Sequence, residues 1–273
     1  MAAADPHVVR RPSRWLFAAE VPRAVGELAW LQAARPALAG APRGDGHTVV
    51  VLPGMGADDR STTSLRRFLS RLGYRVHGWG LGTNLPGRDV PGRLRERLDH
   101  LRARDPEPMS LVGWSLGGIY ARQVARRAPE AVRLVVTLGS PFRSLPGYEG
   151  RAAPLIRAAA LRRGDDAPRT WPGGDDRPLP VPSTSVLSRS DGVVPWRACI
   201  NPRAPRHETL EVIGSHCGLG HHPAVLHVVA DRLAQDPGAW QPLHVPAVWR
   251  PLLRHHAGGA TARPGTGAGD GAG

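Results

Sequence analysis

Ser115 stands in a setting that predicts chemistry, because it lies in a Gly113-Trp114-Ser115-Leu116-Gly117 motif within the run LVGWSLGGIYAR. The residues before it form an apolar run typical of a buried strand, and the residues after it show helical spacing. A G-x-S-x-G motif at a strand-to-helix turn exposes the serine hydroxyl at the tip of a sharp turn. Glycine on both sides lets neighbouring backbone pass close to that turn. The motif therefore predicts a nucleophilic serine.

A serine hydroxyl needs an adjacent base and a group that orients the base, and the sequence offers both downstream of Ser115. Asp191 follows the fifth predicted strand in SRSDGVVP, and His216 follows the sixth in IGSHCG. Both are expected at carboxyl ends of strands, on the sheet edge that holds Ser115. The predicted chemistry is acyl transfer, in which His216 takes the serine proton and Asp191 fixes the imidazole tautomer. The competing residues of these types, which do not directly follow a strand, are Asp175, Asp176, His221 and His222.

The oxyanion of a tetrahedral intermediate also needs hydrogen-bond donors. One predicted donor is the backbone N–H of Leu116, directly after the nucleophile. The other is the N–H of Met55, in the glycine-rich loop LPGMGADD after the first strand. Trp114 and Trp196 are the predicted substrate-binding residues, and ordinary core filling is the alternative for each.

These residues must be positioned by a sheet, and the chain alternates strand and helix patterns to build one. The stretches that contain the predicted strands and the turns directly after them are 47–54, 74–80, 109–114, 132–141, 183–192 and 208–216. The predicted helices between and after them are 61–72, 92–103, 116–128 and 223–235. Continuous apolar strands alternating with helices predict the α/β class, with a doubly wound, mostly parallel sheet of about six strands.

Three parts of the chain are expected. Residues 1–46 form an N-terminal amphipathic helical extension, 47–240 the α/β domain, and 241–273 a largely disordered tail. The apolar side of the extension is expected to pack on the domain, with contact to a membrane surface as the alternative; its residues are Leu16, Phe17, Val21, Val25, Leu28 and Leu31. The proline- and glycine-rich stretch 142–182 interrupts the alternation and is predicted to be an insert that covers Ser115, as an acyl-binding lid, a rigid wall or a loop without a role.

The chain resembles the esterases and lipases of the α/β-hydrolase fold over roughly residues 46–235. The resemblance rests on the serine motif, on the P-G-x-G loop at residues 53–56 and on LGSPFRS at 138–144. It implies a compact carboxylic ester hydrolase that forms an acyl-enzyme and uses neither metal nor organic cofactor. Acyltransferases, thioesterases and polyester depolymerases share the triad, and a non-catalytic binding protein on the same fold is the remaining alternative. A small-molecule or lipid ester is the expected partner.

Composition argues against several other classes. The formal net charge is +13, but arginines are spread along the chain without an interleaved aromatic pattern, so no nucleic-acid partner is expected. No apolar run approaches the about 20 residues of a membrane span. Glu20, Arg23 and Glu27 interrupt any signal-peptide core, which predicts a cytoplasmic protein, with export by an atypical signal as the alternative.

A metal site is not expected, because the spacing of His216, Cys217, His221 and His222 matches no standard zinc pattern. The two cysteines, Cys199 and Cys217, follow the predicted acid and the predicted base. A disulfide between them and a pair of free thiols both stay open at this point.

Overall fold

The structure is a computed structural model that describes residues 12–143, 145 and 176–256. Its centre is a seven-stranded sheet in the order β2-β1-β3-β4-β5-β6-β7. Six strands are parallel, as predicted, and β7 pairs antiparallel with β6. The strands are β1 (Thr48–Leu52), β2 (Arg75–Gly78), β3 (Met109–Trp114), β4 (Val132–Leu138), β5 (Ser183–Leu187), β6 (His207–Val212) and β7 (Leu253–His255).

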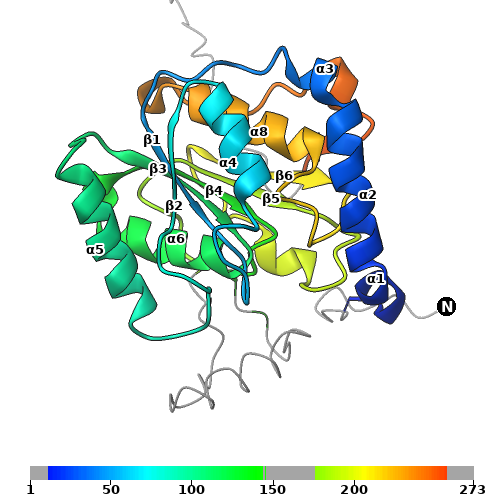
Figure 1. Cartoon of the computed structure of the whole chain (residues 1–273), viewed down its shortest axis with the longest axis horizontal. Coiled ribbons are helices and arrows are strands. Elements are labelled where there is room, and N and C mark those ends of the chain that lie inside the picture. Colours follow the sequence, from blue (N-terminus) through cyan, green and yellow to red (C-terminus); the bar gives the residue numbers. More distant parts are fainter. Residues whose placement is uncertain (1–11, 144, 146–175, 257–273) are drawn as a thin grey trace, which may run out of the picture.

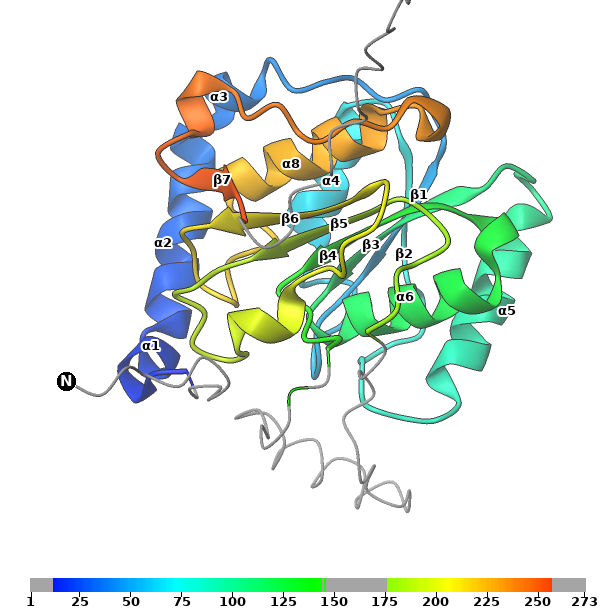
Figure 2. The same ribbon diagram turned by 180° about the vertical axis from the view of Figure 1, so that it is seen from behind.

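Helices cover both faces of the sheet (Figures 1 and 2). One face carries α4 (Thr63–Arg71) and α8 (Pro223–Ala234), and the other carries α5 (Val90–Arg102) and α6 (Leu116–Arg127). Residues that alternate along β1 divide between the two cores, with Val49 and Val51 in the first and Val50 and Leu52 in the second. A strand buried on both faces is expected to be apolar throughout, which explains why TVVVL reads as a continuous run.

Residues 241–256, the first part of the segment 241–273 that is predicted to be largely disordered, have a defined structure. Residues 241–256 return to the domain, bury Leu243, Trp249 and Leu253, and end in β7. Three prolines interrupt this segment, and strand β7 has only three residues, so neither periodicity nor length predicts it. The rest of the predicted tail, 257–273, lies outside the described residues.

The N-terminal extension is helical, as predicted, in α1 (Arg14–Ala18), α2 (Glu20–Ala33) and α3 (Arg35–Leu38). Its orientation differs from the prediction. Leu31 is buried, but Phe17, Val21, Val25 and Leu28 face outward, and the carboxylates on the opposite side of α2 face the domain. Figure 1 shows α2 running along the side of the molecule toward which β5 and β6 point.

Two short ends of the predicted insert 142–182 are described. Phe142, Leu179 and Val181 are buried in the core on the α5 and α6 face, and Arg143 pairs with Asp176 at 3.3 Å. The lid predicted within this insert falls mainly on residues 146–175, which lie outside the described residues.

Candidate active site

Ser115 follows β3 directly and has φ 51° and ψ −120°, a conformation that L-residues rarely adopt. The close packing around this turn leaves no room for side chains at the flanking glycines. A Cβ on Gly113 would lie 2.3 Å from the Cα of Gly118, and one on Gly117 would lie 2.5 Å from the carbonyl oxygen of Pro53. The motif therefore forms the sharp strand-to-helix turn that the sequence predicts, with its strained serine held by the packing of its neighbours.

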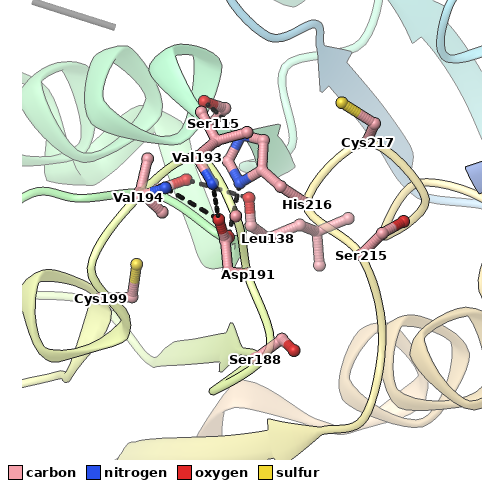
Figure 3. A network of polar contacts seen from close by, with 12 residues as sticks. Ser115, Leu138, Ser188, Asp191, Val193, Val194, Cys199, Ser215, His216 and Cys217 are labelled. Carbon is pink, nitrogen blue, oxygen red and sulfur yellow. Dashed lines mark hydrogen bonds and ion pairs between the residues drawn. The ribbon is translucent and has the colours of Figure 1, made fainter. Parts of the chain in front are cut away.

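The structure brings Ser115, His216 and Asp191 into one chain of hydrogen bonds (Figure 3). His216 Nε2 lies 3.0 Å from Ser115 Oγ, and His216 Nδ1 lies 2.6 Å from Asp191 Oδ2. The histidine and the aspartate are buried, whereas Ser115 is partly exposed. With Nδ1–H donating to the carboxylate, Nε2 is free to accept the serine proton, which is the geometry of a base-activated nucleophile.

Local hydrogen bonds orient Asp191 after β5. Its Oδ1 accepts from the N–H groups of Val193 and Val194 at 2.7 and 2.8 Å, which leaves Oδ2 for the histidine (Figure 3). Asp191 lies in the loop after β5, the acid loop, and His216 lies in the loop after β6, the histidine loop. Ser188 joins the two loops, since its hydroxyl donates to the carbonyl of Gly214 at 2.6 Å. The two loops are therefore tied together before any substrate is present.

The pKa of His216 lies above its ordinary value. Burial by itself lowers the pKa of this imidazole, but the charge and hydrogen bond of Asp191 and the charge of Glu20 outweigh it. His216 therefore holds a proton more readily than a free histidine does, as a general base that must stabilise its charged form requires.

The predicted oxyanion donors stand close to Ser115. The N–H of Leu116 opens α6, and the loop with Met55 approaches so closely that a Cβ on Gly54 would lie 3.5 Å from the Cβ of Ser115. Within the described ranges, neither of the two N–H groups donates to a protein acceptor. Both remain available for an oxyanion.

Asn84 is a residue that the sequence analysis missed. It is fully buried, and its side-chain amide donates to the carbonyl of Pro53 at 2.7 Å. Its backbone carbonyl accepts from Gly56 at 2.7 Å, and its N–H donates to Ala57 at 2.8 Å. Asn84 thus holds the loop that carries Met55 at both ends. No local motif signals this, because the partners are about 30 residues apart in the chain.

The two predicted substrate-binding tryptophans have other contacts. Trp114 donates from Nε1 to the carbonyl of His216 at 3.0 Å, and its ring packs on Gly220. This hydrogen bond supports the loop that carries His216. Trp196 contacts Arg189, Arg197 and His256, none of which belongs to the triad. Neither residue has a contact that places it in an acyl pocket.

Three of the competing acids and histidines lie among the described residues, and each has a contact outside the triad. Asp176 pairs with Arg143, and Asp175 lies outside the described residues. His221 and His222 use Nε2 to bond the carbonyls of Ala24 and Ile213. Across the described residues, no group of three or more His, Cys, Asp or Glu side chains is arranged to hold a metal ion.

Both cysteines are free thiols. Figure 3 places them on opposite sides of the triad, with Cys199 beside the acid loop and Cys217 directly after His216. Burial, followed by the charge of Glu20, raises the pKa of Cys217 to about 11, so this thiol is uncharged at neutral pH.

Among the helices that the structure describes, none is long and apolar enough to cross a membrane.

Comparison with known proteins adds two findings. The pimeloyl-[acyl-carrier protein] methyl ester esterase of Shewanella woodyi is 37% identical over 101 residues, which cover 36% of this chain and 37% of the relative. The enzyme of the same name from Aliivibrio salmonicida is 32% identical over 125 residues, 43% of this chain and 44% of the relative. The chain therefore spans less than half the length of these curated relatives. No family model matches.

Among solved structures, MGS-MChE2, an alpha/beta hydrolase enzyme from the metagenome of lagoon sediments at Mar Chica, Morocco, superimposes with a TM-score of 0.50 at 18% identity. The match covers 70% of this chain and 91% of that one. This chain has the α/β-hydrolase fold. In this hydrolase fold the strand order and the turn after β3 place Ser115 at the carboxyl edge of the sheet, where the loops after β5 and β6 bring Asp191 and His216.

Proposed function

We propose that the chain is a carboxylic ester hydrolase that forms an acyl-enzyme on Ser115. The observation that carries the proposal is the continuous hydrogen-bonded chain from Asp191 through His216 to a serine at φ 51°. A binding protein has no need for a strained serine joined to a buried, ion-paired histidine.

The reaction follows from this geometry. His216 Nε2 removes the Ser115 proton while Oγ attacks the ester carbonyl, and the imidazolium is stabilised by Asp191. The N–H groups of Met55 and Leu116 stabilise the oxyanion. The tetrahedral intermediate expels the alcohol, which takes a proton from His216. Water then enters, gives its proton to His216 and releases the acid, and Ser115 regains its hydrogen.

Ser115→Ala is the direct test. The variant is expected to fold like the wild type, to lose labelling by a fluorophosphonate probe and to hydrolyse p-nitrophenyl butyrate about 10³-fold or more slowly, because the triad acts as a unit. Retained hydrolysis in a clean preparation would reject the proposal. Absence of probe labelling in the wild-type protein would favour the non-catalytic alternative.

The acyl and alcohol groups are a finer proposal. The relatives are named for the hydrolysis of a methyl ester on a carrier-bound acyl chain, and we propose esters of small alcohols as substrates here as well. Methyl and p-nitrophenyl esters of matched acyl chains, assayed beside the corresponding thioesters and with an added alcohol acceptor, separate hydrolase, thioesterase and acyltransferase activity.

A further inference from the structure

Glu20, near the start of α2, is a buried carboxylate that contacts both loops of the candidate triad. Its side chain is 4% exposed. One oxygen accepts from the N–H of Gly192, the residue after Asp191, at 2.7 Å. The other accepts from the N–H of Cys217, the residue after His216, at 2.9 Å. A single side chain, 172 and 197 residues away in sequence, thus holds the backbone beside both Asp191 and His216.

The neighbouring contacts of α2 repeat this arrangement. Arg23 donates to the carbonyl and the hydroxyl of Ser190 in the acid loop at 2.8 and 2.9 Å. Glu27 accepts from the N–H and the hydroxyl of Ser215 in the histidine loop at 2.7 and 2.6 Å. A Cβ on Gly192 would lie 2.5 Å from the backbone between Leu16 and Phe17, so the acid loop also packs directly on α1.

The contacts of Glu20 satisfy two backbone N–H groups that have no strand partner. These N–H groups, of Gly192 and Cys217, lie in irregular loops, and a backbone donor left unpaired away from water destabilises the fold. A charged acceptor satisfies both at once and gives stronger hydrogen bonds than a neutral one. We propose that Glu20 is a positioning residue for the ester hydrolysis, whose carboxylate sets the separation of the acid loop and the histidine loop and adds negative charge beside His216.

The charges around His216 fix the sign of the expected pH effect. The groups that face its surroundings are Asp191 on the acid loop, Glu20 and Glu27 on α2, and the neutral thiol of Cys217. Arg23 is a compensating cation, 3.9 Å from Glu20. The negative charges favour the imidazolium, and Glu20 contributes to the raised pKa of His216. Removing its charge therefore lowers the pH at which the base becomes active.

Glu20→Gln is the test, and it rests on the proposed esterase activity. The amide keeps the size of the side chain but supplies one acceptor oxygen where two N–H groups need acceptors. We expect kcat to fall about tenfold, with KM for p-nitrophenyl butyrate little changed, and the acid limb of the kcat/KM profile to move to lower pH. Glu96→Gln, on the exposed side of α5, makes the same charge change far from the loops and is expected to leave the profile unchanged.

The outcomes are separable. Ser115→Ala in the same assay tests the esterase proposal independently, because a failure there removes the activity that Glu20 would support. An acid limb that stays in place in Glu20→Gln overturns the positioning role, even where the melting temperature falls. If Glu20→Gln does not fold, Arg23→Gln replaces it: loss of the compensating cation should move the acid limb to higher pH, and an unmoved limb overturns the proposal.

The outer side of the same helices carries a second, independent observation. Five large apolar side chains of α1 and α2 are exposed, namely Trp15 (85%), Val21 (67%), Val25 (62%), Phe17 (48%) and Leu28 (41%). These five residues form the outer stripe, in which Val21, Val25 and Leu28 share one side of α2. The exposed positions between them are Ala18, Pro22 and Gly26. This outer stripe is the apolar side that would ordinarily face the core.

Charge indicates what covers the outer stripe. Between residues 13 and 44 the only acidic side chains are Glu20 and Glu27, and both point inward. Exposed Arg14 and Arg35 lie at the two ends, and the whole chain carries +13, which opposes the close pairing of two copies. An apolar helix face bordered by arginine and free of acids suits an anionic lipid surface. We infer that the outer stripe binds the surface of a bilayer with anionic headgroups, beside the acid loop that packs on α1.

Sedimentation with vesicles tests this inference. We expect the wild type to bind phosphatidylglycerol-containing vesicles at least tenfold better than pure phosphatidylcholine vesicles at low salt, and salt to weaken the binding. Trp15→Ser/Val21→Ser should abolish it, whereas Val248→Ser, which changes a 56% exposed apolar residue in the short helix η4 (Ala247–Trp249), outside α1 and α2, should not. Equal sedimentation of both variants overturns the inference. So does a dimer in light scattering that the double variant converts to monomer, which would show that a second copy covers the stripe.

Discussion

The candidate site depends on how each polar atom of Asp191 is used. One carboxylate oxygen accepts two backbone N–H groups, and the other accepts only the imidazole N–H. The backbone donors fix the carboxylate, so the carboxylate can fix the tautomer of His216 with Nε2 facing Ser115. The candidate nucleophile is thus oriented through two successive hydrogen bonds, each of which requires a particular protonation state.

Asp191→Asn tests this at the level of one atom. The amide at this position favours the wrong imidazole tautomer, so kcat is expected to fall by about 10⁴ while the fold is kept. Steady-state hydrolysis of p-nitrophenyl esters measures the loss, and circular dichroism checks the fold. Asp176→Asn, which changes a surface ion pair with Arg143, is the matched control and should keep wild-type rates. If Asp176→Asn lost activity while Asp191→Asn kept it, the acid of the triad would be Asp176, in the predicted insert.

At the scale of elements, the strand-to-helix turn at Ser115 depends on how closely α6 approaches the loop after β1. Leu116 and Gly117 begin α6, and the backbone of Gly117 lies against the carbonyls of Leu52 and Pro53. This approach brings the first turn of α6 against the loop that carries Met55. The serine motif predicts this contact, because the glycine two residues after the nucleophile, Gly117, leaves room for another backbone segment to pass close by.

Gly117→Ala tests the contact through stability. Its new Cβ would lie 2.5 Å from the Pro53 carbonyl oxygen, and such overpacking typically costs about 1–3 kcal/mol. Gly92→Ala is the control, because it also lies in the first turn of a helix, α5, but its Cβ would meet nothing within 4 Å. This control should gain stability, by roughly 0.5–1 kcal/mol. Urea unfolding of both variants gives the two values. Equal stability changes would contradict the close approach.

The orientation of α2 shows what periodicity cannot predict. The sequence places the apolar residues of the extension on one side, and the structure shows most of that side exposed. The backbone N–H groups of Gly192, Ser215 and Cys217 determine which side of α2 faces the domain. They need hydrogen-bond acceptors, and the carboxylates of Glu20 and Glu27 supply them. These N–H groups come together only when β5 and β6 bring their loops side by side in the folded chain. No local pattern in residues 13–40 can therefore predict the orientation of α2.

At the scale of the whole molecule, the central strands and the residues at their carboxyl ends could be predicted from the sequence, whereas the orientation of the N-terminal helices and the course of residues 241–256 could not. Strands β1, β3 and β4 are buried on both faces, so their continuous apolar runs are a strong signal. Three prolines interrupt the stretch 241–256, and its place is fixed by long-range contacts such as the packing of Trp249 on His227 of α8. Asn84 is missed for the same reason.

The C-terminal segment is therefore expected to support the stability of the whole domain. Trp249 is 2% exposed and belongs to the core with Leu253 and the apolar face of α8, whereas the adjacent Val248 is 56% exposed. Trp249→Ala removes a large buried ring and should cost about 3–5 kcal/mol, because the cavity left beside α8 can close only in part. Val248→Ala should change stability by less than about 0.5 kcal/mol. Urea unfolding followed by far-UV circular dichroism measures both, with one cooperative transition expected in each protein. A Trp249→Ala variant as stable as Val248→Ala would show that residues 241–256 lie on the domain without supporting it, and β7 would then be an appendage to the sheet.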